Sequence, residues 1–255
     1  MTKRYYFCIP LAAALFSLAA CRSSYQVAGV ERTRILIDST YDSSIPDDAK
    51  ALLLPYSQEV EKFTSPVMGR LARPMRGHRP ESPLSNLLAD ILVHQSRHYN
   101  EHPDFGVYNM GGIRAGLPQG EITFGQIMEV APFSNKICFL TLKGKDVTAL
   151  FQQMARVGGE GVSHGVELRM TKDKRLISAR LHGKEIVADK DYRIVTIDYL
   201  AEGNDKMTAF KQKFNFNAPA SQENDARFII ADYFKEQQTK GIVIDAQIEG
   251  RTIIE

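Results

Sequence analysis

Four short stretches of the chain carry side chains that could together bind a phosphorylated aromatic ligand. In chain order they are RGHRPESPLSN, NMGGIR, APFSN and DYLAEGND. Arginine guanidinium groups bind phosphate, and a helix start offers free backbone N–H groups to an anion. Aromatic rings stack on a nucleobase, and an amide pairs with its edge. These residue types predict a nucleotide site.

Each of these side chains also has a simpler explanation. Phe133 could belong to the core, since phenylalanine is among the residues most often buried. Tyr199 could finish the strand that YRIVTI predicts, and Asp205 could cap the following helix. Arg114 could be a solvated loop residue after a glycine turn. The residue types alone do not choose between these alternatives.

The stretch NMGGIR follows a short apolar run, FGVYN, and precedes a polar turn. Its glycine pair permits positive φ angles and close approach of another chain segment. Arg114 then supplies a planar, permanently charged group suited to phosphate or carboxylate. We therefore expect a strand that ends in a tight turn beside an anion.

The elements that must position these residues form a mixed series. Leucine and isoleucine recur at helical spacing after Ser82 and Pro83, which suit an N-cap and a first helical residue. Further helices are predicted at 48–63, with a kink or break at Pro55, and at 145–157 and 224–238, with short ones in 120–133 and 198–210. Strands are predicted at 32–38, 105–108, 136–143, 166–170, 176–181 and 192–197, within 65–80, and in the closing run 244–254. This order favours an α+β fold of mixed sheet with packed helices.

The N-terminus has the features of an export signal. Lys3 and Arg4 precede an apolar run that ends in Leu-Ala-Ala-Cys, which is similar to a bacterial lipobox. We expect residues 1–20 to be a signal peptide, Cys21 to carry a lipid, 21–46 to form a tether and 47–255 to form the binding domain. A plain secretory signal is the alternative. The lipid would hold the protein in the bacterial cell envelope, at the periplasmic side of the outer membrane.

Composition restricts the choice of partner. The 255 residues are 44% hydrophobic and 24% charged, as in an ordinary globular protein. Removal of Lys3 and Arg4 with the signal leaves 30 basic residues (32 minus 2) against 30 acidic ones. A neutral balance gives no general attraction to nucleic acid polymers. Cys138 would be the one thiol left, so no internal disulfide is expected.

The ordered series ESPLSNLLAD, NMGGIR, GEITFGQIMEVAPFSN, LKGKDV and YRIVTIDYLAEGND resembles the C-terminal domain of the 5′-nucleotidase family. The resemblance covers about residues 76 to 210. It implies that Phe133 and Tyr199 sandwich the base and that Asn135 contacts it. It also implies that Asp205 binds the ribose.

For the phosphate, the resemblance implies contact with Arg114, with Asn109 near the sugar. Arg79 is the best match for a second phosphate arginine, and Arg76 is its rival. The chain departs from the family pattern at Ser134, where glycine is usual, and at Asn204 and Lys206 in the acidic loop. Loss of glycine limits backbone freedom there.

Complete enzymes of the resembled family carry a second domain with two divalent metals, and we find no metal or catalytic residues for that role here. The sequence has no Asp-x-His and no Gly-Asn-His-(Asp/Glu) motif, and only about 55 residues separate Cys21 from Arg76. His94 and His98 share a helix face without an obvious acid, which favours an exposed helix end. Any metals are therefore expected in a partner metallophosphatase.

Whether the chain takes part in hydrolysis stays open at this point. It could be the nucleotide-recognition part of a split 5′-nucleotidase, a phosphoric ester hydrolase that is inactive without its metal-binding partner. It could instead be a non-catalytic nucleotide- or nucleoside-binding lipoprotein. A structural lipoprotein with a dead pocket is the third possibility.

Overall fold

The computed structural model describes residues 25–36, 38–40 and 45–255. The predicted signal peptide and lipidation site, residues 1–20 and Cys21, lie outside these ranges. Contacts divide the chain into two units, 1–52 and 53–255. In the first, residues 25–36 form neither helix nor strand, so the strand predicted at 32–38 is wrong for 32–36. A short run without a paired neighbour has no ladder of backbone hydrogen bonds to hold it extended.

Helix α2 (Asp47–Thr64) runs through Pro55, so of the two predicted outcomes, a kink or a break, the break is wrong. None of its residues is buried. An exposed helix tolerates proline better than a packed one because water can solvate the carbonyl that loses its donor. At its end Phe63 packs edge-on against Phe124, with ring centroids 5.1 Å apart. Within the ranges described, no helix is both long and apolar enough to cross a membrane.

The second unit is built on a five-stranded mixed sheet, which confirms the α+β prediction. Its strand order is β10 (Phe214–Asn217), β4 (Ile137–Lys143), β9 (Asp191–Ile197), β2 (Phe105–Tyr108) and β5 (Gly161–Val162). Strands β2 and β9 are parallel, whereas all the other pairs are antiparallel. The predicted strands 105–108, 136–143 and 192–197 are therefore confirmed, and they form its centre.

Two helices cover opposite faces of this sheet. Phe105 of β2 packs against Phe151 of α5 (Gly144–Val157), with ring centroids 5.5 Å apart. The next residue, Gly106, faces α3 (Pro83–Gln95), where a Cβ atom would lie 2.8 Å from a methyl group of Val93. Since neighbouring strand residues point to opposite faces, α5 and α3 lie on opposite sides. Their apolar stripes bury the core of the unit.

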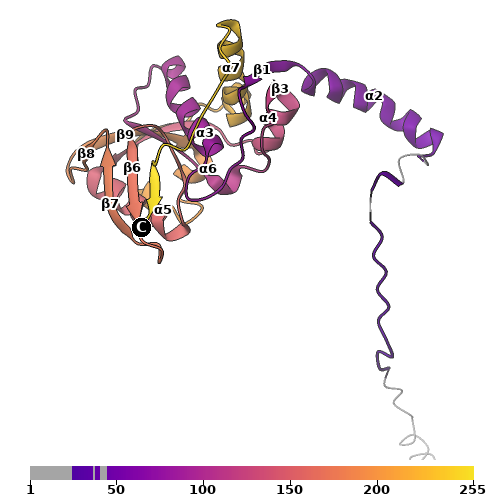
Figure 1. Cartoon of the computed structure of the whole chain (residues 1–255), viewed down its shortest axis with the longest axis horizontal. Helices are drawn as coiled ribbons and strands as arrows, with labels where there is room; N and C mark the ends of the chain where they lie inside the picture. Colours follow the sequence, from indigo (N-terminus) through magenta and orange to yellow (C-terminus); the bar gives the residue numbers. More distant parts are fainter. Residues whose placement is uncertain (1–24, 37, 41–44) are drawn as a thin grey trace, which may run out of the picture. The chain divides into compact units, whose positions relative to one another are not determined.

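Two smaller sheets complete the fold. Strands β11 (Thr252–Ile254), β6 (Val166–Met170), β7 (Leu176–Leu181) and β8 (Lys184–Glu185) form one, and the C-terminal strand lies beside β6 (Figure 1). Strands β1 (Val67–Leu71) and β3 (Gly120–Thr123) form the other. The remaining helices are α4 (Phe124–Val130), α6 (Asp198–Ala201) and α7 (Ala226–Thr239), with short 3₁₀ turns η2 (Ser96–Tyr99), η3 (Met110–Gly112), η4 (Thr208–Gln212) and η5 (Gln222–Asn224).

Helix α3 begins as its sequence predicts. Ser82 is the N-cap, its hydroxyl accepts from the Ser85 backbone N–H, and Pro83 is the first helical residue. The Ser85 hydroxyl in turn accepts from the Ser82 N–H at 3.1 Å. Both serines are buried, so water cannot replace these bonds.

Replacing Ser82 by alanine is expected to lower the free energy of unfolding by about 1–2 kcal/mol, because loss of the hydroxyl leaves the buried Ser85 N–H group without a partner. Urea titration measures the change. Ser57→Ala, on the exposed helix α2, is the matched control and should lie within about 0.5 kcal/mol of the wild type. Equal unfolding free energies for the two variants would contradict this account of the helix start.

Candidate functional site

One edge of the five-stranded sheet gathers the predicted site residues. Parallel strands β2 and β9 both end there, at Tyr108 and Ile197. The antiparallel strands β4 and β5 both begin there, since Ile137 pairs with Ile197 and Gly161 with Tyr108. The segments that leave or enter this edge therefore meet, although they are far apart in sequence. Ligands commonly bind beyond the carboxyl ends of such strands.

A pocket of about 360 Å³ lies at this edge. Its size falls within the range for small-molecule sites. Six of the seven predicted binding residues line it, together with two glycines: Asn109, Gly111, Gly112, Arg114, Phe133, Asn135, Tyr199 and Asp205. The seventh, Arg79, is not among the lining residues.

The glycine pair in NMGGIR allows the Asn109 and Asp205 side chains to lie close to the backbone of the turn. Neither Gly111 nor Gly112 has a positive φ angle. A Cβ atom on Gly112 would lie 2.6 Å from the Asn109 Oδ1 atom, and one on Gly111 would lie 3.3 Å from the Asp205 Oδ2 atom. Of the two reasons expected for the pair, the structure supports close packing and contradicts a left-handed turn.

Asp205 is held by two donors from different segments. The Asn109 Nδ2 group donates to its Oδ2 atom at 3.0 Å, and the Tyr199 hydroxyl donates to its Oδ1 atom at 2.9 Å. This bond to a carboxylate raises the pKa of Tyr199. The other amide atom of Asn109, Oδ1, is buried and has no hydrogen-bond partner among the described residues. A carboxylate has lone pairs beyond the two used here, so Asp205 can still accept from a ligand.

Arg114 and the two aromatic rings also line the pocket. The Arg114 Cζ atom lies 5.6 Å from the centroid of the Phe133 ring, within the distance for a cation–π contact. Phe133 is 45% exposed and Tyr199 is 37% exposed, so neither belongs to the core. Large aromatic residues at a pocket wall leave a flat apolar surface available to a ligand.

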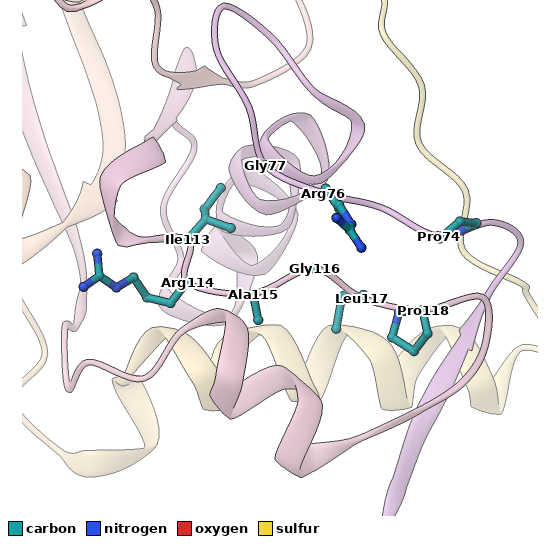
Figure 2. Close-up of a pocket in the computed structure, with 9 residues that line it drawn as sticks. All are labelled: Pro74, Arg76, Gly77, Ile113, Arg114, Ala115, Gly116, Leu117 and Pro118. Carbon is teal, nitrogen blue, oxygen red and sulfur yellow. The ribbon is translucent and has the colours of Figure 1, made fainter. Parts of the chain in front are cut away.

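A second, larger groove adjoins this pocket. It has a volume of about 520 Å³ and lies between the segments 74–77 and 113–118. Figure 2 shows Arg76 directed toward the Gly116 segment, whereas the Arg114 side chain extends away from Arg76 at the other end of that segment. Arg114 lines both cavities, so the groove continues from the pocket. Both arginines are exposed.

Arg79 instead pairs with Glu160, which precedes β5. Its Nη2 atom lies 2.5 Å from the Glu160 Oε1 atom, and its Nη1 group donates to the Gly159 carbonyl. The Glu160 side chain is fully buried. Burial and the nearby Asp205 carboxylate raise the pKa of Glu160 to about 7, against the lowering effect of Arg79.

Sequence reasoning did not identify Glu160. The stretch GGEGVSHG indicated only a glycine-rich loop. A single acid between glycines at the start of a strand was the available signal.

The departures from the expected motif have structural counterparts. The Ser134 hydroxyl accepts from the Arg227 Nη2 group at 2.5 Å and is not part of the pocket lining. Asp205 and Lys206 have φ angles of 51° and 67°, in the left-handed region. The loop therefore adopts a glycine-like conformation without glycine, at some cost in strain.

Comparison with known proteins agrees with this geometry. The sequence model of the family described as "5′-nucleotidase, C-terminal domain" matches residues 64–212, which is more than half of the chain. The chain belongs to this family. The matched range includes every residue that lines the pocket.

Individual relatives and a solved structure support the assignment. The chain is 26% identical over 224 residues to the trifunctional nucleotide phosphoesterase protein YfkN of Bacillus subtilis, covering 80% of this chain and 15% of the relative. It is 24% identical over 170 residues to the protein UshA of Yersinia enterocolitica, covering 65% and 31%. The crystal structure of a 5′-nucleotidase precursor from Thermus thermophilus matches with a TM-score of 0.69 and 26% identity, covering 84% and 44%. The chain therefore spans less than half the length of each.

No metal centre is visible in the part of the chain that the structure describes. It contains no group of three or more His, Cys, Asp or Glu side chains placed to hold an ion. His94, the first histidine of the pair considered from sequence, lies 3.2 Å from Glu236 of α7. Arg97 and Lys240 contact the same carboxylate, and their positive charge opposes a cation there.

Proposed function

We propose that the pocket at the sheet edge binds a nucleotide, with the base between Phe133 and Tyr199. Asn135 contacts the base, Asp205 accepts from the ribose hydroxyls, and Asn109 lies near the sugar. The phosphate lies at Arg114. The observation that carries the proposal is the convergence of two exposed rings, an arginine, two amides and a carboxylate on one pocket of nucleoside size.

For the second phosphate contact we propose Arg76. It shares a groove with Arg114, whereas both terminal nitrogens of Arg79 are already bonded, one to Glu160 and one to a carbonyl. An arginine engaged in this way has less capacity left for phosphate. Arg79 remains a candidate from the sequence.

We further propose that the chain recognises substrate for a 5′-nucleotidase reaction in which a separate two-metal phosphatase chain provides the catalysis. The metals would generate the attacking hydroxide and stabilise the leaving oxygen. Support comes from family membership and from the names of the relatives, which include a nucleotide phosphoesterase and a 5′-nucleotidase precursor.

Phosphate release from AMP tests the division of labour. The purified protein with added Mg²⁺, Mn²⁺ or Zn²⁺ should release no phosphate above buffer. Addition of an exported metallophosphatase encoded beside it should restore release, and Arg114→Ala should weaken that restored activity. Turnover by the chain alone would contradict the proposal. Nucleotide affinity that no such partner converts into turnover would instead favour the alternative, a non-catalytic nucleotide-binding envelope protein.

We also propose that the protein is a lipoprotein anchored through Cys21 at the periplasmic side of the outer membrane, with residues 21–46 as a tether. The support is the lipobox-like sequence. Mass spectrometry of the mature N-terminus after expression in a bacterial host tests it. A diacylglyceryl-modified Cys21 is expected, and an unmodified N-terminus elsewhere would contradict the anchor.

The Tyr199 hydroxyl is expected to matter for the sugar more than for the base. Tyr199→Phe keeps the ring but removes a donor to Asp205, whose backbone is strained. We expect adenosine affinity to fall by about 0.5–1.5 kcal/mol, the value of one hydrogen bond. Calorimetry with adenosine and 2′,3′-dideoxyadenosine separates the two effects, since the loss should be confined to adenosine. Equal losses for both ligands would contradict this role.

A further inference from the structure

Glu160 is a buried acid that the proposed binding mode does not use. It stands at the sheet edge directly before β5, opposite Asn109 at the end of β2. Its Oε2 atom accepts from the Met110 backbone N–H at 2.5 Å, and its Oε1 atom accepts from Arg79. One carboxylate therefore joins three separate segments: the loop before α3, the loop before β5 and the turn η3.

The Met110 N–H group needs this partner. It is the first N–H of the turn η3, where a helical segment leaves its donors unpaired. Asn109 is the N-cap, but its side chain makes no capping bond and instead donates to Asp205. Met110 is buried, so water does not supply an acceptor. Glu160 caps the turn from a distant segment.

The capped turn carries much of the pocket wall. Asn109, Gly111 and Gly112 line the pocket, and so does Arg114, two residues after Gly112. A shift of the turn would move the Asn109 amide, which holds Asp205. It would also move the Gly111 carbonyl, which accepts from the Arg114 guanidinium at 3.3 Å. The sugar and phosphate contacts therefore depend on one backbone position.

We propose that Glu160 is a positioning residue for the nucleotide pocket: its carboxylate, paired with Arg79, holds the Asn109–Gly112 turn in the binding conformation, and protonation loosens that turn. The proposal rests on the nucleotide site proposed above and adds a pH dependence to it. In this proposal Arg79 contributes to nucleotide binding indirectly, as the counter-charge of Glu160.

The charges around Glu160 favour titration near neutral pH. Arg79 stabilises the carboxylate, whereas burial and Asp205 oppose it, which gives the pKa of about 7. From the β6–β7 turn, the Lys174 Cε atom lies 3.9 Å from the position that a Cβ atom on Gly158 would take. From α3, Ser85 faces Gly161 and is uncharged. Among the described residues, Arg79 and Asp205 are the charged groups with the largest effects on the pKa of Glu160.

Holding this charge in the interior costs the fold stability. The carboxyl binds a proton more readily in the folded protein than at its ordinary value of 4.5. Between those two pKa values the folded state carries more protons than the unfolded state, so stability falls as pH rises through that window. A buried acid that destabilises the fold at neutral pH is typical of a functional position.

Methionine amide signals test the turn without any nucleotide. The sequence has 8 methionines, so selective ¹⁵N-methionine labelling gives few signals, and Met110→Leu identifies the one of interest. We expect the Met110 amide shift to titrate with a midpoint near the Glu160 pKa of about 7. Glu160→Gln should abolish this titration. Glu167→Gln, at an exposed position of β6, is the charge-matched control and should leave it unchanged.

Arg79→Gln provides an independent variant. Loss of the counter-charge should move the Met110 midpoint to higher pH, because the carboxylate loses the stabilising charge of Arg79. A Met110 midpoint that does not move in Arg79→Gln would contradict the pairing of Glu160 with Arg79. This variant keeps the proposal testable even if Glu160→Gln does not fold.

Nucleoside affinity tests the link to the pocket. Adenosine, guanosine, cytidine and uridine are uncharged near neutral pH. A change of affinity with pH for the nucleoside that binds most tightly therefore reports titration of the protein and not of the ligand. We expect about fivefold weaker binding at about pH 6 than at about pH 8 in the wild type, and a flat profile in Glu160→Gln.

A Met110 signal that does not titrate, or that titrates equally in Glu160→Gln, would overturn the proposal. So would a titrating signal with pH-independent nucleoside affinity. If no nucleoside binds, the nucleotide function fails, while the Met110 titration still decides whether Glu160 holds the turn.

Discussion

The double substitution Phe133→Ala and Tyr199→Ala is expected to weaken AMP binding by about 2–5 kcal/mol. Each base–ring contact contributes about 1–3 kcal/mol, and the two act on the same base, so simple addition sets an upper range. This loss corresponds to about 30-fold to several thousandfold in the dissociation constant. Both rings are exposed, so their removal should leave the core intact. Isothermal titration calorimetry measures the affinity.

A second pair of exposed aromatic residues provides the control. Phe216 is 43% exposed and has Lys213 over its ring at 5.1 Å, which matches the arrangement of Phe133 and Arg114. Tyr56 is exposed on α2. Phe216→Ala with Tyr56→Ala should retain wild-type affinity. If both double variants bind AMP as the wild type does, the Phe133 and Tyr199 rings do not hold the base.

Arg114→Ala is expected to cost about 1.5–3 kcal/mol of AMP affinity and much less adenosine affinity. The two losses differ because only AMP carries a phosphate. A hydrogen bond to a charged group contributes about 1.5–3 kcal/mol, which adenosine cannot gain from Arg114. A smaller loss for adenosine follows from the cation–π contact with Phe133, which helps to hold that ring. Calorimetry with both ligands, at low and high salt, gives the two losses.

Arg156→Ala, at an exposed position near the end of α5, is the matched control and should change neither affinity. Removal of Arg114 should also reduce the salt dependence of AMP binding, since one ion pair is lost. Equal losses for adenosine and AMP would show that Arg114 acts through Phe133 and does not contact the phosphate.

The central strands and the start of α3 could be predicted from sequence because the signals are local. Alternating or continuous apolar runs mark β2, β4 and β9, and Ser82 followed by Pro83 marks the helix start. Strand β10, with the sequence FNFN, was not predicted. It is an edge strand that is mostly exposed and is defined by its pairing with β4, which no local pattern reports.

The pocket residues were predicted together because the family resemblance gave their order, and the fold places six of them around one cavity. The order of the motifs did not decide whether Arg79 or Arg76 is the second phosphate contact. Both occur in one basic loop, and the choice depends on Glu160, which is 81 residues beyond Arg79 in the chain. A buried counter-charge acts over that sequence distance only after folding, so the loop sequence does not report which arginine is engaged.

Of the two reasons predicted for the glycine pair, close approach is confirmed and positive φ angles are wrong, because the deciding contacts come from residues outside the pair. The sequence indicates that side chains are excluded at Gly111 and Gly112 but does not say what excludes them. The structure shows that the obstacles are the Asn109 amide and the Asp205 carboxylate, so the pair belongs to the pocket wall.

Crystal structures of the protein grown with AMP, GMP, CMP and UMP test the binding mode most directly. The account predicts that at least one nucleotide occupies the pocket with its base between the Phe133 and Tyr199 rings. Its ribose hydroxyls should then lie within hydrogen-bonding distance of Asp205, and its phosphate should contact Arg114. A nucleotide bound elsewhere, or an empty pocket with all four ligands at saturating concentration, would contradict it.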